Sequence, residues 1–81
     1  LYPQKNISIP IGQNNPLNDP IVKKVIKEQE SSLINKGRII VRESGTEPII
    51  RVMVESKEEK IINDICKKIV SSIEKSKEKN N

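Results

Sequence analysis

The amino-acid sequence predicts an α+β fold, a two-layer sandwich in which two helices pack on one face of an antiparallel sheet. Three short segments have strand-like patterns, and two longer segments repeat their apolar residues at helical spacing. In each helical segment the apolar residues lie on one side, so both helices need an apolar surface to cover them. A single sheet of three to four strands meets this need, and the pattern assigns three of those strands.

The length and composition fit one small domain. The chain has 81 residues, of which 33% are hydrophobic, and it contains one Tyr and neither Phe nor Trp. Because aromatic side chains normally supply the largest buried areas, the core has to be built from Ile, Val and Leu. A chain of this length buries only about 60–65% of its unfolded surface, so its stability alone would be marginal. We therefore expect residues 1–81 to form a single domain that is a fragment of a larger multidomain chain.

The charge, cysteine content and hydropathy disfavour several classes of partner. There are 15 Lys and Arg against 11 Asp and Glu, a net charge of +4, and the lysines are scattered instead of forming the basic stripe typical of nucleic-acid binding. The one cysteine, Cys66, cannot form an intrachain disulfide, and a chain without His has no usual zinc ligand set. No apolar run approaches the ~20 residues of a membrane span, and no signal peptide is recognisable. We expect a cytoplasmic protein with no metal site in this segment, no membrane partner and no nucleic-acid partner.

The N-terminal segment predicts a strand with one buried face. Residues 6–11 alternate between apolar and polar side chains, which indicates a strand with one buried face. The apolar side consists of Ile7, Ile9 and Ile11. Pro10 lacks the N–H group that an interior strand donates, so it indicates an edge position or the end of the strand. Residues 12–16 then predict a loop.

The next segment predicts a helix with a clear start. Asp19 is expected as the N-cap and Pro20 as the first helical residue, where its fixed backbone angle suits a helix. The apolar residues that recur at helical spacing are Ile21, Val22, Val25 and Ile26. The helix is expected to end near Ser31-Ser32, and Gly37 is expected to close the connection to the next strand.

Two further strands follow, and their short connection predicts a hairpin. Residues 38–42 contain the unbroken apolar run Ile39-Ile40-Val41, which indicates a buried strand. Residues 49–55 form the second strand, and its apolar face consists of Ile50, Val52 and Val54. Only residues 43–48 separate the two strands, a length typical of a β-hairpin.

The last segment predicts a second helix. Ser56 and Glu59 have the spacing of a capping box, so the helix is expected to begin at Ser56. Its apolar stripe consists of Ile61, Ile62, Ile65, Cys66, Ile69, Val70 and Ile73. Because Cys66 lies in this stripe, we interpret it as a small buried hydrophobic residue. Residues 76–81 are polar and are expected to fray.

One stretch, Arg-Glu-Ser-Gly-Thr-Glu-Pro-Ile-Ile-Arg, has the side chains of an anion-binding site. Ser44 and Thr46 carry hydroxyl donors, and Gly45 allows a ligand to approach the backbone closely. Successive N–H groups in a tight loop can form a concave anion site. Arg42 and Arg51 flank the loop, so in a hairpin both could converge on one anion, and the planar fork of Arg matches two phosphate oxygens at once.

The same stretch is also compatible with an ordinary solvent-facing turn. Ser-Gly-Thr occurs in such turns, and Arg residues at strand ends commonly reach water. Glu43 and Glu47 would repel an anion unless they point away from it. Neither glutamate has a partner His, Lys or metal site that the sequence identifies, so we expect no catalytic residue in this chain.

The motif Arg42-x-Ser44-Gly45-Thr46-Glu47-Pro48-x-x-Arg51-Val52 resembles the phosphate-binding loop in the C-terminal domain of the α-D-phosphohexomutases. The segments Val52-Met53-Val54-Glu55, Gly37-Arg38 and Tyr2-Pro3-Gln4 extend the resemblance over nearly all of the chain, in the same element order. Gly45 and the run Arg-Val-Met-Val-Glu are most similar to the phosphoglucosamine mutase branch of this family. Glu43 departs from the family pattern, in which this position is often neutral or basic.

The resemblance implies an activity for a complete enzyme and a role for this domain. Such an enzyme interconverts glucosamine 6-phosphate and glucosamine 1-phosphate through a phosphoserine and a bisphosphorylated sugar, with Mg²⁺ beside the serine. The phosphoserine and the aspartates that hold Mg²⁺ belong to other domains, so this chain alone is not expected to be active. By the resemblance, this domain holds the phosphate that is not reacting, and its partners are the phosphosugar and the other domains of the same enzyme. The implied phosphate-binding residues are Arg42, Ser44, Gly45, Thr46 and Arg51, with Glu47 as a further substrate contact.

Two alternative functions come from other classes of protein. One is a small basic α+β module that binds RNA, although the strands lack aromatic side chains that stack on bases and no Gly-x-x-Gly loop is present. The other is a structural domain whose hairpin contacts a protein partner. RNA binding would weaken steeply as the salt concentration rises, which distinguishes the first alternative.

Overall fold

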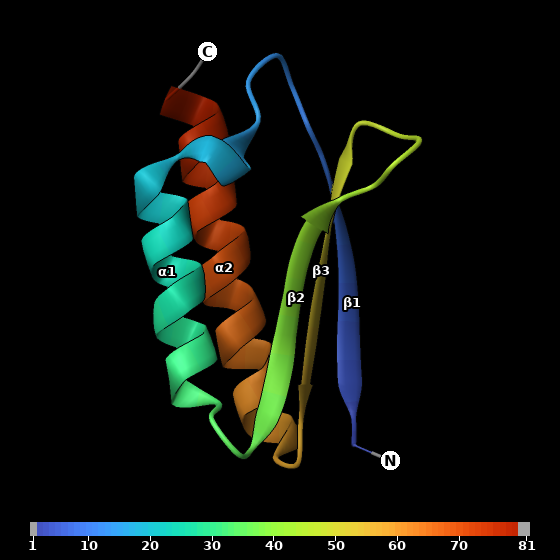
Figure 1. The fold of residues 1–81 in the computed structure, drawn as a ribbon, viewed down its shortest axis with the longest axis vertical. Helices are drawn as coiled ribbons and strands as arrows, with labels where there is room; N and C mark the ends of the chain where they lie inside the picture. Colours follow the sequence, from blue (N-terminus) through green and yellow to red (C-terminus); the bar gives the residue numbers. More distant parts are fainter. Residues whose placement is uncertain (1, 80–81) are drawn as a thin grey trace.

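The structure, a computed structural model, describes residues 2–79, which form a two-layer α+β sandwich (Figure 1). In chain order the elements are β1 (Gln4–Pro10), the 3-10 helix η1 (Pro16–Asn18), α1 (Pro20–Ser32), β2 (Gly37–Glu43), β3 (Ile49–Ser56) and α2 (Glu59–Lys79). The strands form one antiparallel sheet, and α1 and α2 lie side by side on one of its faces. The predicted fold class is therefore confirmed, with three strands in the part of the chain that the structure describes.

The strand order is β1-β3-β2, so the last strand of the chain lies in the centre of the sheet. This order confirms the predicted hairpin of β2 and β3, and both alternatives for Pro10 apply, since β1 is an edge strand and Pro10 is its last residue. The expectation that residues 38–42 form a buried strand is wrong, because β2 is the second edge strand. Ile39 is buried against the helices, whereas Ile40 points to the face that carries no helix and is 37% exposed.

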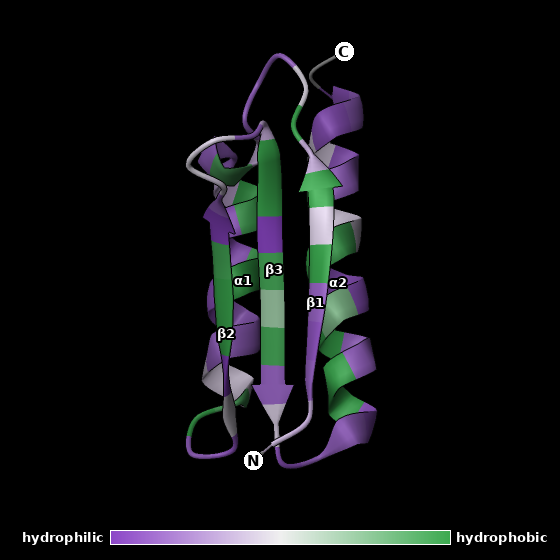
Figure 2. Cartoon of the chain, turned by 90° about the vertical axis from the view of Figure 1, so that its right-hand side faces the viewer, coloured by the Kyte–Doolittle hydropathy of each residue, from purple (hydrophilic) through white to green (hydrophobic). Residues whose placement is uncertain are grey.

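Alternation along β3 divides the sheet into two faces. The side chains of β3 that face the helices are at most 1% exposed, and they are the predicted set Ile50, Val52 and Val54. The opposite face, here named the open face, carries the alternate side chains Arg51, Met53 and Glu55. Figure 2 looks onto the open face, with both helices behind the sheet.

The core between the sheet and the helices consists of aliphatic side chains and one thiol, as the absence of Phe and Trp predicts. Its buried residues are Ile9, Val22, Leu33, Ile39, Ile50, Val52, Val54, Ile62, Ile65, Cys66, Ile69 and Ile73. The apolar stripe predicted for the second helix is confirmed, with Ile61 and Val70 at its half-buried margins. Burial raises the pKa of the Cys66 thiol, which agrees with its interpretation as a buried hydrophobic residue.

The predicted start of α1 is confirmed. Asp19 is the N-cap, its carboxylate accepts a hydrogen bond from the Ile21 N–H at 2.9 Å, and Pro20 is the first helical residue. The predicted loop before it ends in η1, which begins with the buried Pro16. The expectation that Ile21 lies on the apolar face is wrong. Its side chain is 57% exposed, because Val22 takes the position that faces the sheet.

The predicted start of α2 is wrong. Ser56 is the last residue of β3, and α2 begins only at Glu59. The Ser56 hydroxyl donates to the Lys36 carbonyl and accepts from the Glu58 N–H, each at 3.2 Å. This serine therefore joins the end of β3 to the turn before β2 instead of forming a capping box with Glu59.

The connection from α1 to β2 depends on two special backbone positions. Asn35 is the non-glycine residue with positive φ in the described chain, at 65°, a conformation that Asn tolerates better than most residues. Gly37 closes the connection as expected, since its N–H donates to the Leu33 carbonyl at 3.1 Å, and it is also the first residue of β2. A Cβ atom on Gly37 would overlap the Glu55 carbonyl oxygen and lie 2.8 Å from the Ser56 Cα, so the fold requires glycine here.

The C-terminal end of α2 is ordered further than expected. The helix continues to Lys79, and Ser76, expected at the start of a frayed tail, is only 2% exposed. The Lys79 Nζ lies 3.9 Å from the Asp19 Oδ2, so the end of α2 contacts the start of α1. Residues 80–81 of the expected tail lie outside the described residues. Neither helix of the described chain is both long and apolar enough to cross a membrane.

Candidate functional site

The stretch that resembles a phosphate-binding loop forms the tip of the β2–β3 hairpin. The tip, residues 44–48, projects past one end of the sheet and leans away from the helices, toward the side of the open face (Figure 1). The Ile49 N–H donates to the Glu47 carbonyl at 2.8 Å, and the Ile11 N–H donates to the Pro48 carbonyl at 2.7 Å. The second bond links the tip to the end of β1, so the tip is fixed at its base.

The tip offers several hydrogen-bond donors, but not all that the sequence suggests. The Ser44 N–H donates to the Ile49 carbonyl at 2.9 Å, so this group is already used in the hairpin. Within the described chain the N–H groups of Gly45, Thr46 and Glu47 have no backbone partner. The Ser44 and Thr46 hydroxyls and these successive free N–H groups therefore remain as donors for an anion.

Arg42 and Arg51 lie directly opposite each other in the β2–β3 pairing, and both are exposed on the open face. Opposite residues of an antiparallel pair have Cβ atoms about 4.5–5.5 Å apart, and like charges placed this way destabilise the sheet. Among residues 2–79, neither guanidinium has a carboxylate within 4.0 Å, whereas Arg38 on the same strand and face pairs with Glu55 at 3.0 Å. The structure thus brings the two arginines together and leaves their charges without a local counter-charge.

The two glutamates of the stretch take different positions. Glu43 pairs with Ile50, which faces the helices, so alternation places Glu43 on the helix side of the sheet. It therefore lies on the face opposite to Arg42 and Arg51, which meets the condition that this carboxylate point away from a bound anion. Glu47 is exposed at the tip.

Gly45 has no structural reason within this chain to be glycine. Its φ angle is not in the left-handed region, and a Cβ atom at this position would meet nothing within 4 Å. Alanine would therefore fit the fold as described. The contrast with Gly37 shows that the glycine of the tip is not explained by packing or by backbone conformation.

The row of the sheet that contains the two arginines continues onto β1. Ser8 pairs with Arg51, is exposed, and lies with it on the open face. No motif or local pattern in the sequence identifies this residue as part of a site. Alternation in residues 6–11 places it opposite to Ile7 and Ile9, but its partner on β3 depends on register between distant segments, which the pattern does not give.

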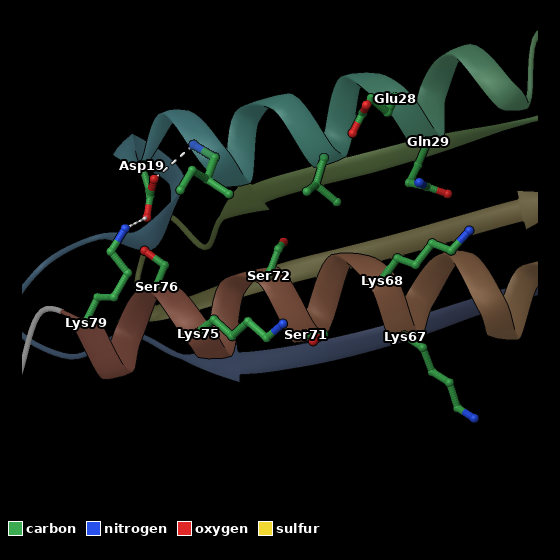
Figure 3. A pocket seen from close by; sticks show the side chains of 12 residues that line it. Asp19, Glu28, Gln29, Lys67, Lys68, Ser71, Ser72, Lys75, Ser76 and Lys79 are labelled. Atoms are coloured by element: carbon green, nitrogen blue, oxygen red, sulfur yellow. Dashed lines mark hydrogen bonds and ion pairs between the residues drawn. The ribbon is translucent and has the colours of Figure 1, made fainter.

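A separate groove runs between α1 and α2 (Figure 3). Exposed Ile21 lines it together with Asp19, which lies at one end of the groove in Figure 3. The pKa of the Asp19 carboxyl is lowered, first by the hydrogen bond from the Ile21 N–H and further by the nearby Ser76 hydroxyl and the Lys79 ammonium. The Ser76 oxygen is buried and has no partner at hydrogen-bonding distance in the described chain. No residue that lines this groove belongs to the hairpin, so the groove is not part of the candidate site.

The described residues do not fit a metal ion. In residues 2–79 no group of three or more His, Cys, Asp or Glu side chains comes together in a way that could hold one. The Mg²⁺ that the resemblance implies for a complete enzyme therefore finds no ligand set in this part of the chain.

Comparison with known proteins adds a family match. Residues 6–72 match the family described as phosphoglucomutase/phosphomannomutase, C-terminal domain. The chain is 45% identical over 73 residues to a phosphoglucosamine mutase of Phenylobacterium zucineum (strain HLK1), a match that covers 90% of this chain and 16% of that protein. It is 44% identical over 75 residues to the phosphoglucosamine mutase of Haemophilus ducreyi, a match that covers 91% of this chain and 17% of that protein. It is 40% identical over 78 residues to the phosphoglucosamine mutase of Lactococcus lactis subsp. lactis, with the same two shares covered. The chain thus spans about one-sixth of the length of these curated relatives.

Proposed function

Because the chain belongs to the phosphoglucomutase/phosphomannomutase family, whose C-terminal domain it matches over residues 6–72, we propose that it is the substrate-phosphate-binding domain of a phosphoglucosamine mutase. The complete protein would interconvert glucosamine 6-phosphate and glucosamine 1-phosphate through a phosphoserine and a bisphosphorylated sugar. The rest of that protein would supply the phosphoserine and the ligands of Mg²⁺, which when bound would stabilise charge during phosphoryl transfer. A cytoplasmic location is part of the same proposal.

The observation that supports this role most strongly is the unbalanced pair Arg42 and Arg51. Two guanidinium groups placed directly opposite each other repel, and no carboxylate of the described chain offsets their charge. A phosphate bound between them would remove the repulsion and accept charge-assisted hydrogen bonds from both. The pair lies beside the tip of the hairpin, whose N–H groups at residues 45–47 have no backbone partner in the described chain.

The remaining residues of the proposed site would each have a different role in binding the substrate. The Ser44 and Thr46 hydroxyls and the free N–H groups of Gly45 and Thr46 would donate to the phosphate oxygens. The absence of a side chain at Gly45 would let the phosphate approach the backbone. Glu47 would contact the rest of the substrate, because an exposed carboxylate at the tip can accept hydrogen bonds from sugar hydroxyl or ammonium groups.

Holding the phosphate that does not react serves catalysis at the other end of the substrate. Binding energy from a remote group can be used to place the reacting group correctly. The bisphosphorylated intermediate would present first one phosphate and then the other to this site. A site that reads only phosphate, and leaves recognition of the sugar to other residues, suits both orientations.

The proposal is tested by steady-state kinetics with glucosamine 6-phosphate, using the full-length protein that carries this domain. Replacing Arg51 or Arg42 by Ala should raise KM and lower kcat, with kcat/KM falling about 10- to 100-fold, because each arginine donates charge-assisted hydrogen bonds. The matched control is Arg38→Ala. Arg38 is an exposed arginine on the same strand and face as Arg42, but it pairs with Glu55 and lies outside the proposed site.

Two results would contradict the proposal. Unchanged kcat/KM in both site variants would show that the hairpin does not bind substrate. A loss as large in Arg38→Ala as in the site variants would show that total positive charge matters and not this pair. RNA binding that weakened steeply with salt would support the alternative class, although the middle row of the open face carries Ile40 and Met53 where stacking aromatic residues would be expected.

A further inference from the structure

Ser8 is the neighbour of Arg51 on the side away from Arg42. The register pairs Arg42 with Arg51 and Arg51 with Ser8, so the three residues form one row across the sheet. All three are exposed on the open face. Directly opposite residues have Cβ atoms about 4.5–5.5 Å apart, which places the Ser8 hydroxyl within reach of the Arg51 side chain.

Arg51 has two direct neighbours in this row, and only one of them can accept a hydrogen bond from it. A guanidinium has donors and no acceptor, so Arg42 can only repel Arg51. A serine hydroxyl has two acceptor lone pairs. The open-face positions of β1 that lie diagonal to Arg51 are Asn6 and Pro10, and Pro10 has no polar side chain.

The Ser8 hydroxyl has no hydrogen-bond partner among the described residues, Arg51 included. Among residues 2–79 it takes part in no side-chain hydrogen bond, and its side chain is on the face that packs against no helix. Core packing therefore does not explain a hydroxyl at this position. The residues on either side of it, Ile7 and Ile9, do the packing for this part of β1.

We propose that Ser8 is a positioning residue: when Arg51 turns toward a phosphate that it shares with Arg42, the Ser8 hydroxyl accepts a hydrogen bond from the Arg51 guanidinium and stabilises that orientation. This inference rests on the proposed function, since it names the residue that orients one of the phosphate-binding arginines. Ser8 itself does not need to reach the phosphate. Its contribution is one hydrogen bond that stabilises the phosphate-bound orientation of a long side chain that Arg42 would otherwise push away.

The test is a double-mutant cycle in the full-length protein, with kcat and KM for glucosamine 6-phosphate measured for Ser8→Ala, Arg51→Ala and the double variant. Ser8→Ala alone should raise KM about two- to tenfold, the value of one hydrogen bond. In the Arg51→Ala background the same change should have no further effect, because its partner is gone. Ser8→Thr keeps the hydroxyl and suits a strand, so it should restore the KM of the unaltered protein.

Asn6→Ala is the matched control, because Asn6 is a polar, exposed residue of the same strand and face but pairs with Met53. Its KM should not change. A normal KM in Ser8→Ala, or an equal loss in both Arg51 backgrounds, would overturn the role of Ser8 while the proposed function stands. An unchanged kcat/KM in Arg51→Ala would instead show that the proposed function fails, and the role of Ser8 with it.

Discussion

The two ends of the β2–β3 hairpin differ in what holds their residues in place. At the end where β2 begins, Gly37 has no room for a side chain, and the buried Ser56 donates its hydroxyl hydrogen to the Lys36 carbonyl. At the tip, Gly45 is surrounded by open space, and N–H groups are left without backbone partners in the described chain. One end is thus closely packed and joined by hydrogen bonds, while the other is hydrogen-bonded only at its base.

This difference separates residues that the fold explains from residues that it does not. The Glu55 carbonyl explains why position 37 is glycine, and nothing in the described chain explains why position 45 is. The opposed pair Arg42 and Arg51 is likewise unfavourable for the sheet by itself. Residues that lack a structural reason and gather at one end of a hairpin are candidates for binding, which is why the tip and not the other end is proposed as the site.

The largest effect is expected from filling the packed end. Gly37→Ala should lower the free energy of unfolding by about 3 kcal/mol. The new Cβ overlaps backbone atoms of Glu55 and Ser56, which cannot move aside as the end of a flexible side chain could. Amide exchange of the β2–β3 segment, measured by mass spectrometry in the full-length protein, should become about 100-fold faster. Gly12→Ala is the control, since a Cβ there meets nothing within 4 Å. Normal exchange in Gly37→Ala would mean that the close approach of Glu55 does not constrain the fold.

A smaller effect, of a different kind, is expected at the tip. Gly45→Ala should leave amide exchange unchanged or slightly slower, since replacing Gly by Ala where the conformation allows it stabilises by about 0.4–1 kcal/mol. It should lower kcat/KM about tenfold, because the added methyl group occupies space that the phosphate needs, a cost of about 1.4 kcal/mol. Gly12→Ala again serves as the control. Full activity in Gly45→Ala, or faster exchange, would remove the contrast between the two ends.

The smallest effect is expected at the N-cap of α1, which lies at the same end of the molecule as the tip (Figure 1). The pKa of Asp19 is lowered in the folded chain, so the contribution of its carboxylate to stability is complete above about pH 4, the ordinary range of Asp, and is lost as the pH falls through the lowered pKa. Asp19→Asn keeps a capping acceptor and does not titrate. Between about pH 5 and about pH 3 its melting temperature should therefore fall slightly less than that of the unaltered protein. An equal fall in both would show that Asp19 does not contribute to the acid sensitivity.

Local patterns were sufficient to predict most of the fold. The Asp19-Pro20 start of α1, the alternation in β1 and β3 and the stripe of α2 depend on residues close in the sequence, and the structure confirms each of them. The hairpin followed from the short connection between its strands. These features need no knowledge of distant contacts.

The remaining features depend on contacts between distant segments. Ser56 has the sequence context of a helix cap, but the Lys36 carbonyl, far away in the chain, takes its hydroxyl. The exposure of Ile40 follows from a strand order that the pattern does not specify. In the candidate site the motif identified the residues, whereas the opposition of the arginines, the position of Glu43 on the helix side of the sheet and the place of Ser8 came from the register.

The strand order also sets the sequence of events when the chain folds. β1 is made first, yet its pairing partner in the sheet, β3, is made after α1 and β2. The β2–β3 hairpin needs only a short loop to close, whereas the β1–β3 pairing must close most of the chain, so we expect the hairpin to form first and β1 to join it late. Arg42 and Arg51 would then meet early, and Ser8 would reach Arg51 only when the sheet is complete. The row of these three residues would therefore be complete only in the fully folded domain. An intermediate that contains the hairpin but not β1 would have the two arginines without the serine beside them.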